Sequence, residues 1–335
     1  MLCAIRLIVL RPVGIEYRLG DFKHGVIQLN SQSQPLVSIG IPTYNRLSGL
    51  KSVLKCIREQ TYSNLEIIVS DNCSPGDEID QYMHLVTKDD PRIRYFRQSH
   101  NIGALANFGF VLTKATGKYF AWAADDDTCE GRFVEEIVDQ MEQDSKIVLC
   151  ACDVKNIDEH DNLMWIDYLE SIRPTCDWNK TRRLFFRYPT SNIFFCIYGI
   201  YNTQILRMCN LQLIKGWNGY VSNGEVPYLA HVSSFGKIVA IPEVLKTYKR
   251  HQASGYHEEI KRLKKLDVFM IRLVIRARLC KLALFDKSDF STRFSLLSAV
   301  TGSFFSDITS FNLKGKIAYF LPKKVKNYIK TRLHL

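Results

Sequence analysis

Apolar and polar residues follow two regular patterns from residue 36 onward. Short apolar runs predict strands, whereas apolar residues spaced three or four apart predict helices. The predicted strands are 37–41, 65–69, 93–96, 119–124, 147–154 and 238–241. The predicted helices are 47–57, 104–116 and 133–141. Strands that alternate with helices over short links predict an α/β fold, in which a doubly wound, mostly parallel sheet carries helices on both faces.

Composition divides the 335 residues into three segments. Residues 1–34 show no clear period and end in a polar stretch, so we interpret them as an N-terminal extension. Residues 35–255 hold the regular pattern and form the predicted folded domain. Residues 256–335 are basic and helical in pattern, and we expect them to form a separate C-terminal region.

The net charge of +11 comes from the C-terminal region, which holds 17 basic and 6 acidic side chains. An electrically balanced body argues against nucleic-acid binding, and a basic tail favours contact with an anionic surface. Apolar and basic residues interleave over 260–285, as in helices that lie on membranes, although a solvated helix face is the alternative. A second basic group consists of Lys323, Lys324, Lys326, Lys330 and Arg332.

The ten cysteines indicate neither a zinc site nor a disulfide scaffold, because they form no CxxC pair and no paired Cys/His spacing. Reduced thiols in a cytosolic compartment are the simplest interpretation. Residues 1–10 are apolar but are interrupted by Arg6 and lack a cleavage site, so we do not interpret them as a signal peptide. No charge-free apolar run reaches membrane-spanning length. We therefore expect a cytoplasmic protein that is not integral to a membrane.

Three consecutive carboxylates, Asp125, Asp126 and Asp127, follow the apolar run 119–124. They would emerge at the carboxyl end of a buried strand, where open α/β sheets bind ligands. Side-chain oxygens suit Mn²⁺ or Mg²⁺, and Mg²⁺ commonly joins one or two carboxylates to substrate phosphates. Alternatively, the acids and Thr128 merely begin the next helix. The segment after the first strand, Pro42-Thr43-Tyr44-Asn45-Arg46, is not a glycine-rich phosphate loop.

Several blocks follow one another in the predicted domain: Val37-Ser38-Ile39-Gly40-Ile41-Pro42-Thr43-Tyr44-Asn45-Arg46, Ile67-Ile68-Val69-Ser70-Asp71-Asn72-Cys73-Ser74, Asn101-Ile102-Gly103 with Asn107, and the Asp triplet. In this order they resemble family 2 glycosyltransferases of the GT-A fold, and are similar to bacterial O-antigen and capsule sugar transferases. Residues 225–254 resemble the family's later region more loosely. Residues 1–34 and 256–335 lie outside the resemblance.

The resemblance implies a nucleotide-sugar donor bound mainly by residues 35–145. Asp71 would accept a hydrogen bond from the base, which suits the ring N–H of uracil, thymine or guanine and hence a UDP-, dTDP- or GDP-sugar. A turn role for Asp71 is the alternative. The implied donor-binding residues are Pro42, Thr43, Tyr44, Asn45, Asp71, Asn101, Gly103, Asn107, Arg250 and His251.

The resemblance also implies the catalytic groups. Asp125 and Asp127 match the family's Asp-x-Asp metal-binding spacing, and Asp126 would face the donor sugar. A general base must take the acceptor's proton, and Glu225 is the candidate. Many relatives carry Glu-Asp where this chain has Glu225-Val226, so only one of the two carboxylates is present. A helix-start role for Glu225 is the alternative.

The implied activity is a metal-dependent, inverting transfer of a sugar to a hydroxyl of a glycan or lipid-linked acceptor in surface polysaccharide biosynthesis. Residues 146–255 would form the acceptor half, and the basic C-terminal region would hold the enzyme at the inner face of the cell membrane. Aromatic residues over 165–188 either line the acceptor cleft or belong to the core. A sugar-phosphate nucleotidyltransferase is an alternative, but it should carry a glycine-rich basic loop after the first strand. A non-catalytic membrane-associated module that binds nucleotide-sugars is the other alternative.

Overall fold

The computed structural model describes residues 34–124, 128–187, 192–214, 225–250 and 265–310. Contacts between residues divide the chain into two units, Met1–Gln34 and Pro35–Leu335, and the elements below belong to the second. The strands are β1 (Val37–Thr43), β2 (Leu65–Asp71), β3 (Ile93–Arg97), β4 (Tyr119–Trp122), β5 (Thr128–Cys129), β6 (Ile147–Ile157), β7 (Leu163–Asp167), β8 (Ile200–Asn202) and β9 (Lys237–Lys249).

The helices fill the connections between these strands. They are α1 (Leu47–Arg58), α2 (Glu78–Asp89), α3 (Ala104–Lys114), α4 (Phe133–Gln143), α5 (Trp178–Arg182), α6 (Thr203–Met208), α7 (Glu225–Val232), α9 (Lys265–Leu284) and α10 (Phe290–Ser310). Short 3₁₀ helices are η1 (Glu170–Ile172), η2 (Arg183–Phe186), η3 (Asn192–Tyr198) and η4 (Leu211–Ile214).

The described strands form one sheet in the order β3-β2-β1-β4-β8-β6-β9-β5, and β7 pairs with β6. The strands β3, β2, β1 and β4 are parallel, and so are β6 and β9. The remaining pairs are antiparallel. The predicted α/β fold is confirmed, and its sheet is mixed beyond β4. An apolar run predicts that a strand is buried but does not specify its direction, so the sequence pattern could not show these antiparallel pairs.

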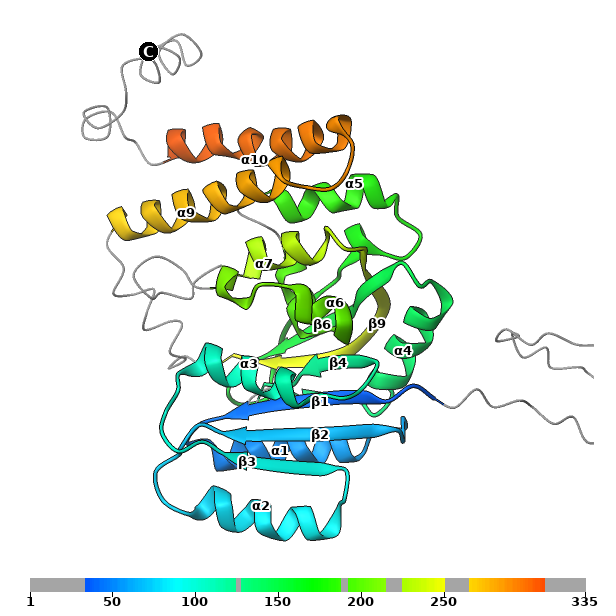
Figure 1. The fold of residues 1–335 in the computed structure, drawn as a ribbon, viewed down its shortest axis with the longest axis vertical. Helices are drawn as coiled ribbons and strands as arrows, with labels where there is room; N and C mark the ends of the chain where they lie inside the picture. Colours follow the sequence, from blue (N-terminus) through cyan, green and yellow to red (C-terminus); the bar gives the residue numbers. More distant parts are fainter. Residues whose placement is uncertain (1–33, 125–127, 188–191, 215–224, 251–264, 311–335) are drawn as a thin grey trace, which may run out of the picture. The chain divides into compact units, whose positions relative to one another are not determined.

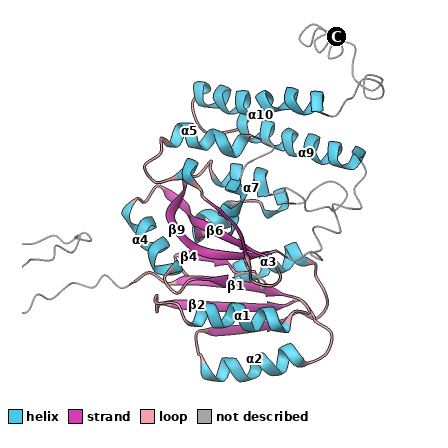
Figure 2. Cartoon of the chain, turned by 180° about the vertical axis from the view of Figure 1, so that it is seen from behind, coloured by secondary structure: helices cyan, strands magenta, loops and turns pink. Residues whose placement is uncertain are grey.

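Two hydrophobic cores cover the two faces of the sheet. Apolar side chains of α1, α2 and α4 pack on one face together with Val37, Ile39 and Ile41 of β1. The other face carries Phe120 and Trp122 of β4, which pack with side chains of α3, α7 and α9. Figure 1 shows α3 in front of the sheet, and the reverse view in Figure 2 shows α1 in front. The alternation of side chains along the strands thus assigns each helix to one face.

Helix α3 lies directly against β1 at Gly40. A Cβ atom at this position would lie 2.7 Å from Cγ2 of Val111 and 2.8 Å from Cζ of Phe120. A glycine is therefore required here, because any side chain would push α3 away from the strand. This close packing fixes the beginning of α3 beside the carboxyl ends of β1 and β2.

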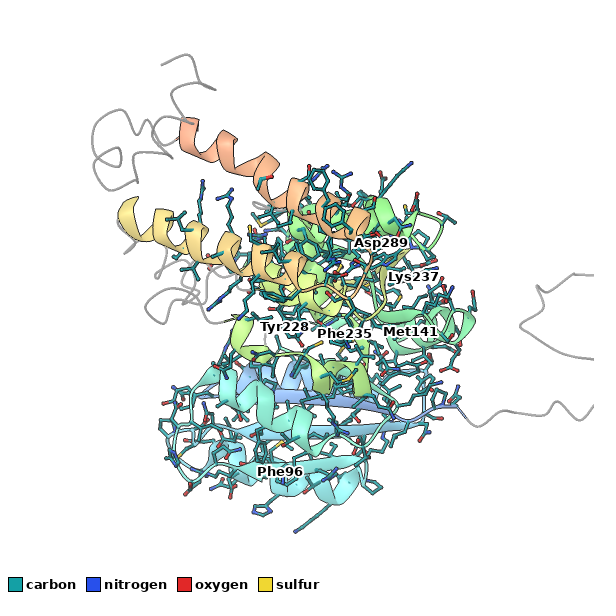
Figure 3. All side chains as sticks on the ribbon, turned by 45° about the horizontal axis from the view of Figure 1, so that its top comes forward. Phe96, Met141, Tyr228, Phe235, Lys237 and Asp289 are labelled. Carbon is teal, nitrogen blue, oxygen red and sulfur yellow. The ribbon has the colours of Figure 1, made fainter. Side chains whose placement is uncertain are left out.

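The C-terminal region is helical over its described part, as predicted, and it is packed into the fold. Helix α9 buries Ile271, Ile275, Leu279 and Ala283 in the same core as α7. In Figure 3, Tyr228 of α7 lies between α9 and the lower part of the sheet. Among the described helices, none combines the length and apolar character needed to cross a membrane. The second basic group, residues 323–332, lies outside the described residues.

The aromatic residues over 165–188 divide between the core and the surface, and their part in an acceptor cleft stays a prediction. Phe185 and Phe186 are core residues with almost no exposed surface. Trp165 and Tyr168 are 41% and 54% exposed, so they remain available to a ligand. Tyr188 lies outside the described residues.

Candidate active site

The Asp triplet lies outside the described residues, but the segments on both sides of it are described. Strand β4 runs parallel to β1, with Trp122 beside Gly40, and the amide of Ala123 donates to the carbonyl of Gly40 at 2.9 Å. After the triplet, Thr128 begins β5 and pairs with Thr247 of β9. The chain therefore enters the triplet at the carboxyl end of β4, beside the carboxyl end of β1.

Asp71 is a fully buried carboxylate at the end of β2, directly beside Thr43 of β1. The amide of Ser74 donates to Asp71 Oδ1 at 3.1 Å, and the hydroxyl of Ser74 also donates to Oδ1. The guanidinium Nε of Arg97 lies 3.7 Å from Oδ2. These groups hold the carboxylate in one orientation at the end of the strand, and its contact with a nucleotide base stays a prediction.

Ser74 also connects Asp71 to the segment after β1. The amide of Asn45 donates to Ser74 Oγ at 2.7 Å, and Asn45 has a positive φ of 54°. Asparagine tolerates this left-handed conformation better than most residues. Pro42 and Thr43 are buried at the end of β1, while Tyr44 is 44% exposed. The structure thus brings the predicted residues of the first two blocks together.

A second asparagine network joins the predicted third block to the same edge. The side-chain amide of Asn72 donates to Asn101 Oδ1 at 3.0 Å, and Asn72 Oδ1 accepts from the amide of Ile102 at 2.9 Å. Gly103 has a φ of 85°, and no atom lies within 4 Å of a Cβ built there. The backbone conformation, rather than crowding, therefore favours glycine at this position.

Asn107 is buried in α3, and its side chain forms hydrogen bonds with Ser70. Its Oδ1 accepts from the hydroxyl of Ser70 at 2.6 Å, and its Nδ2 donates to the carbonyl of Ser70 at 3.0 Å. These contacts attach α3 to the end of β2. Asn107 therefore positions α3 at the carboxyl end of β2, and its contact with a ligand stays a prediction.

A polar cavity of about 800 Å³ opens at this edge of the sheet. Its lining residues include Asn45, Ser48, Ser74, Thr128, Thr247 and Lys249. They come from the segments after β1 and β2, from the first turn of α1, and from β5 and the end of β9. Helix α1 has no acidic side chain in its first turn, but two carboxylates from other segments, Glu78 and Asp161, also line the cavity.

Glu225 is the first residue of α7, on the face of the sheet that also carries α3 and α9. Burial raises the pKa of its carboxyl group above the usual range. A raised pKa suits a group that takes up a proton near neutral pH. Its neighbour Val226 is buried in the core, so it supplies packing and no second carboxylate.

Arg250 follows the end of β9 and is held by aromatic side chains. Its guanidinium carbon lies 4.6 Å from the ring centroid of Trp165 and 5.5 Å from that of Tyr248. Its Nε donates to Asn156 Oδ1 at 3.3 Å. These contacts orient the cation, while the neighbouring His251 lies outside the described residues.

The sequence reasoning missed the residues that support the site. Ser74 contacts both Asp71 and Asn45, Ser70 holds Asn107, and Asn72 holds Asn101. All three supporting residues lie in the block from Ile67 to Ser74 that carried the resemblance. The signal was therefore the run of small polar residues after a buried strand, which predicts local side-chain to backbone bonds.

The chemistry of the triplet fits a divalent cation, because three carboxylates supply the oxygen ligands that Mn²⁺ and Mg²⁺ prefer. Within the described ranges, no group of three or more His, Cys, Asp or Glu side chains could hold a metal ion. The assignment of Asp125 and Asp127 as metal ligands stays a prediction.

The fold and this edge define a GT-A glycosyltransferase architecture. The family model described as glycosyl transferase family 2 matches residues 38–206, which is half of the chain. The chain belongs to this family.

Two bacterial relatives each match less than a third of this chain. A putative colanic acid biosynthesis glycosyl transferase, WcaA, of Escherichia coli is 36% identical over 97 residues, covering 29% of this chain and 34% of that protein. A GalNAc(5)-diNAcBac-PP-undecaprenol beta-1,3-glucosyltransferase of Campylobacter jejuni is 37% identical over 94 residues, covering 28% and 30%. The match spans about a third of the length of these relatives.

A third relative matches over a longer stretch. This uncharacterized glycosyltransferase of Haemophilus influenzae is 27% identical over 246 residues, covering 69% of this chain and 72% of that protein.

Solved structures show the same fold at low sequence identity. Residues 1–349 of S. aureus TarS, in complex with UDP-GlcNAc, align with a TM-score of 0.60 and 14% identity, covering 89% of this chain and 79% of that one. The mannosyltransferase PcManGT from Pyrobaculum calidifontis, in complex with GDP-Man and Mn²⁺, aligns with a TM-score of 0.51 and 13% identity, covering 90% and 85%.

Proposed function

We propose that this protein transfers a sugar from a nucleotide-sugar donor to a hydroxyl group, with a divalent cation at the Asp triplet. The observation that carries the proposal is the polar cavity, which joins the residues after β1 and β2 to Thr128, directly after the triplet. Family membership supports the activity, and the UDP-GlcNAc and GDP-Man complexes of the structural relatives support the class of donor.

Residues 35–145 form the donor half in this proposal. The buried carboxylate of Asp71 accepts the ring N–H of a uracil, thymine or guanine base, since Ser74 already fixes its orientation. Tyr44 is exposed at the end of β1 and packs against the nucleotide. Asp126 faces the donor sugar, and Arg250 and His251 contribute positive charge near the diphosphate.

Glu225 acts as the general base that takes the proton from the acceptor hydroxyl. Its raised pKa brings the carboxylate closer to the working pH, where proton transfer by a positioned group is most effective. The hydroxyl then attacks the anomeric carbon in line with the departing diphosphate, so the anomeric configuration inverts. A cation bound by Asp125 and Asp127 would offset the charge on the diphosphate.

The acceptor is a glycan or a lipid-linked glycan of a surface polysaccharide, and residues 146–255 bind it. The names of the E. coli and C. jejuni relatives support this class of acceptor. Trp165 and Tyr168 are exposed aromatic side chains in this half and can stack on a sugar. The basic C-terminal region 256–335 keeps the enzyme at the inner face of the cell membrane.

The proposal is tested by thermal shift against UDP-, dTDP- and GDP-sugars, with and without Mn²⁺ or Mg²⁺. We expect one nucleotide class to raise the unfolding temperature only when metal is present, because ligand binding stabilises the folded state. The preferred donor should then release its nucleoside diphosphate slowly in a coupled assay. Stabilisation without any diphosphate release would favour a non-catalytic binding module. Release of pyrophosphate from a nucleoside triphosphate and a sugar phosphate would favour a nucleotidyltransferase.

A further inference from the structure

Two cysteine side chains meet between α1 and β5, although they lie 73 positions apart along the chain. Cys56 lies on α1, and Cys129 is the last residue of β5. Their sulfur atoms are 2.8 Å apart, and both side chains are partly exposed. The amide of Cys129 also donates to Sγ of Cys56 at 3.0 Å. The two thiols therefore face each other, and Sγ of Cys56 also lies 3.0 Å from both the amide nitrogen and the carbonyl oxygen of Cys129.

The backbone around the pair is already held in place. The side-chain amide of Gln60 donates to the carbonyl of Glu130 at 2.8 Å, and its Oε1 accepts from the amide of Val134 at 3.0 Å. The amide of Thr61 donates to the carbonyl of Gly131 at 2.8 Å. These contacts attach the end of α1 to the segment after β5. A covalent bond between the two sulfurs therefore needs little rearrangement of the backbone.

We propose that Cys56 and Cys129 form a reversible disulfide when the protein meets a peroxide, and that this bond lowers sugar transfer. The regulatory part rests on the proposed function of the site. Because disulfides in reducing compartments are usually transient or redox-sensing, such a pair suits a switch better than a permanent staple.

The oxidation balances with hydrogen peroxide as the oxidant. The thiolate of Cys56 attacks one peroxide oxygen, the O–O bond breaks, and the departing hydroxide takes a proton to become water. This leaves a sulfenic acid on Cys56. The thiol of Cys129 then attacks that sulfur, the S–S bond forms, and the sulfenic hydroxyl leaves with the thiol proton as a second water. Two thiols are oxidised and one peroxide is reduced.

The position of the pair connects this bond to the site. Thr128 lines the polar cavity, immediately before Cys129 and immediately after the triplet. Ser48 and Ser52 of α1 line the same cavity. A bond between α1 and β5 would therefore fix two walls of the cavity relative to each other. Displacements of about 1 Å in residues that position a substrate can lower turnover about 100-fold.

The first test concerns the bond alone. The full chain is treated with hydrogen peroxide, and peptide mass spectrometry is used to find a Cys56–Cys129 cross-link that is lighter than the two thiols by two hydrogen atoms. We expect the cross-link in the wild type, its removal by dithiothreitol, and its absence in Cys56→Ser and Cys129→Ser. Peroxide treatment that oxidises other cysteines but leaves these two unlinked would overturn the proposal.

The second test concerns the effect on transfer. We expect peroxide to lower kcat about tenfold or more in the wild type and in the matched control Cys176→Ser, with recovery on reduction. Cys176 is a partly exposed cysteine whose Sγ contacts the carbonyl of Glu170, away from the pair. Cys56→Ser should keep its turnover under peroxide. A cross-linked wild type with unchanged kcat would contradict the regulatory role.

A protein that transfers no sugar even when reduced would instead refute the proposed function. The cross-link measurement would still decide whether the pair oxidises. In that case, the Mn²⁺-dependent shift in unfolding temperature replaces turnover as the readout for the triplet. We expect oxidation to reduce that shift in the wild type but not in Cys56→Ser.

Discussion

The carboxylate of Asp127 is the residue on which the metal assignment depends most directly. An amide in its place keeps the shape of the side chain but removes the negative charge that a divalent cation requires. We expect Asp127→Asn to lower Mn²⁺-dependent turnover about 100-fold or more, as measured by release of nucleoside diphosphate. The unfolding temperature without metal should stay unchanged.

Asp89→Asn is a matched control, because Asp89 is an exposed carboxylate at the end of α2. It should retain full turnover. Undiminished turnover in Asp127→Asn itself would remove this residue from the metal site.

Substitution of Glu225 should affect catalysis and stability in different directions. Burial raises its pKa, so the folded protein favours the protonated form, and ionisation of Glu225 costs stability as the pH rises. Glu225→Gln keeps a neutral side chain, so its unfolding temperature at neutral pH should equal or exceed that of the wild type. Transfer should fall by about 10²- to 10⁴-fold, the usual contribution of a general base.

The pH dependence of kcat provides the independent check on Glu225. Wild-type turnover should fall on the acidic side, at a pH above the ordinary range of glutamate, and this limb should be absent from the residual activity of Glu225→Gln. Equal transfer rates in the two proteins would assign Glu225 to the structure of α7 alone.

Among the elements, the turn between α9 and α10 is attached to the body by a buried ion pair. Arg182 of α5 donates to Asp286, and each residue is 8% exposed. Burial alone would raise the pKa of Asp286, but hydrogen bonds from Ser288 and Arg182 outweigh it and keep the pKa below its usual range. Because the pKa is lowered in the folded state, this contribution to stability is present at neutral pH and is lost as the pH falls below about 4.

We expect Asp286→Asn to lower the free energy of unfolding by about 3 kcal/mol, because it leaves the guanidinium of Arg182 buried without its counter-charge. Urea unfolding at pH 7 and at a pH below about 4 measures the effect. The difference between variant and wild type should shrink in acid, where the wild-type carboxylate is also neutral. An equal difference at both pH values would show that the charge of Asp286 does not stabilise the turn.

Elements with strong apolar periodicity could be predicted from the sequence, and weaker ones could not. The predicted strand 37–41 corresponds to β1, and the predicted helix 133–141 corresponds to α4. In the structure each element extends two residues further at its carboxyl end. Helix α2 buries only Ile79, Met83 and Val86, so its polar majority hid the period. Strand β9 extends to Lys249, far beyond the predicted end at 241, because Pro242 and Glu243 interrupt its apolar run.

The candidate site was predictable where the residues adjoin a strand end in sequence. Thr43 and Asp71 lie opposite each other because parallel strands in register bring their carboxyl ends to one edge. The pairing of Cys56 with Cys129 had no such signal, since a helix residue and a strand residue far apart in sequence meet only through tertiary packing. The same reason hid the stacking of Arg250 on Trp165.

For the whole molecule, the packing of α9 decides how membrane attachment can be tested. Removal of all residues after Gly255 would strip Ile271, Ile275 and Leu279 from the core and expose the apolar surface of α7. We expect that truncation to lower the unfolding temperature by about 10 °C or more, because several core side chains are lost at once. Loss of liposome binding in the truncated protein would then be uninformative.

Replacement of Lys323, Lys324, Lys326 and Lys330 by Gln leaves the described core intact and removes charge from the predicted membrane contact. Liposome flotation should show weaker binding to anionic vesicles, by about 1 kcal/mol per removed charge at low salt, and no change with neutral vesicles. A variant with the same number of Lys→Gln changes at Lys51, Lys55, Lys88 and Lys114 is the control. Equal binding of both variants would refute the tail's role.

The contribution of α9 and α10 to the core also determines the order in which the two hydrophobic cores are completed during synthesis. The face of the sheet that carries α1, α2 and α4 draws its side chains from residues 37–245, so it can close early. The other face receives Leu296, Ala299 and Val300 only after α10 has been synthesised. The nascent domain therefore leaves apolar surface on α7 uncovered until α9 and α10 emerge, and exposed apolar surface of this kind promotes aggregation.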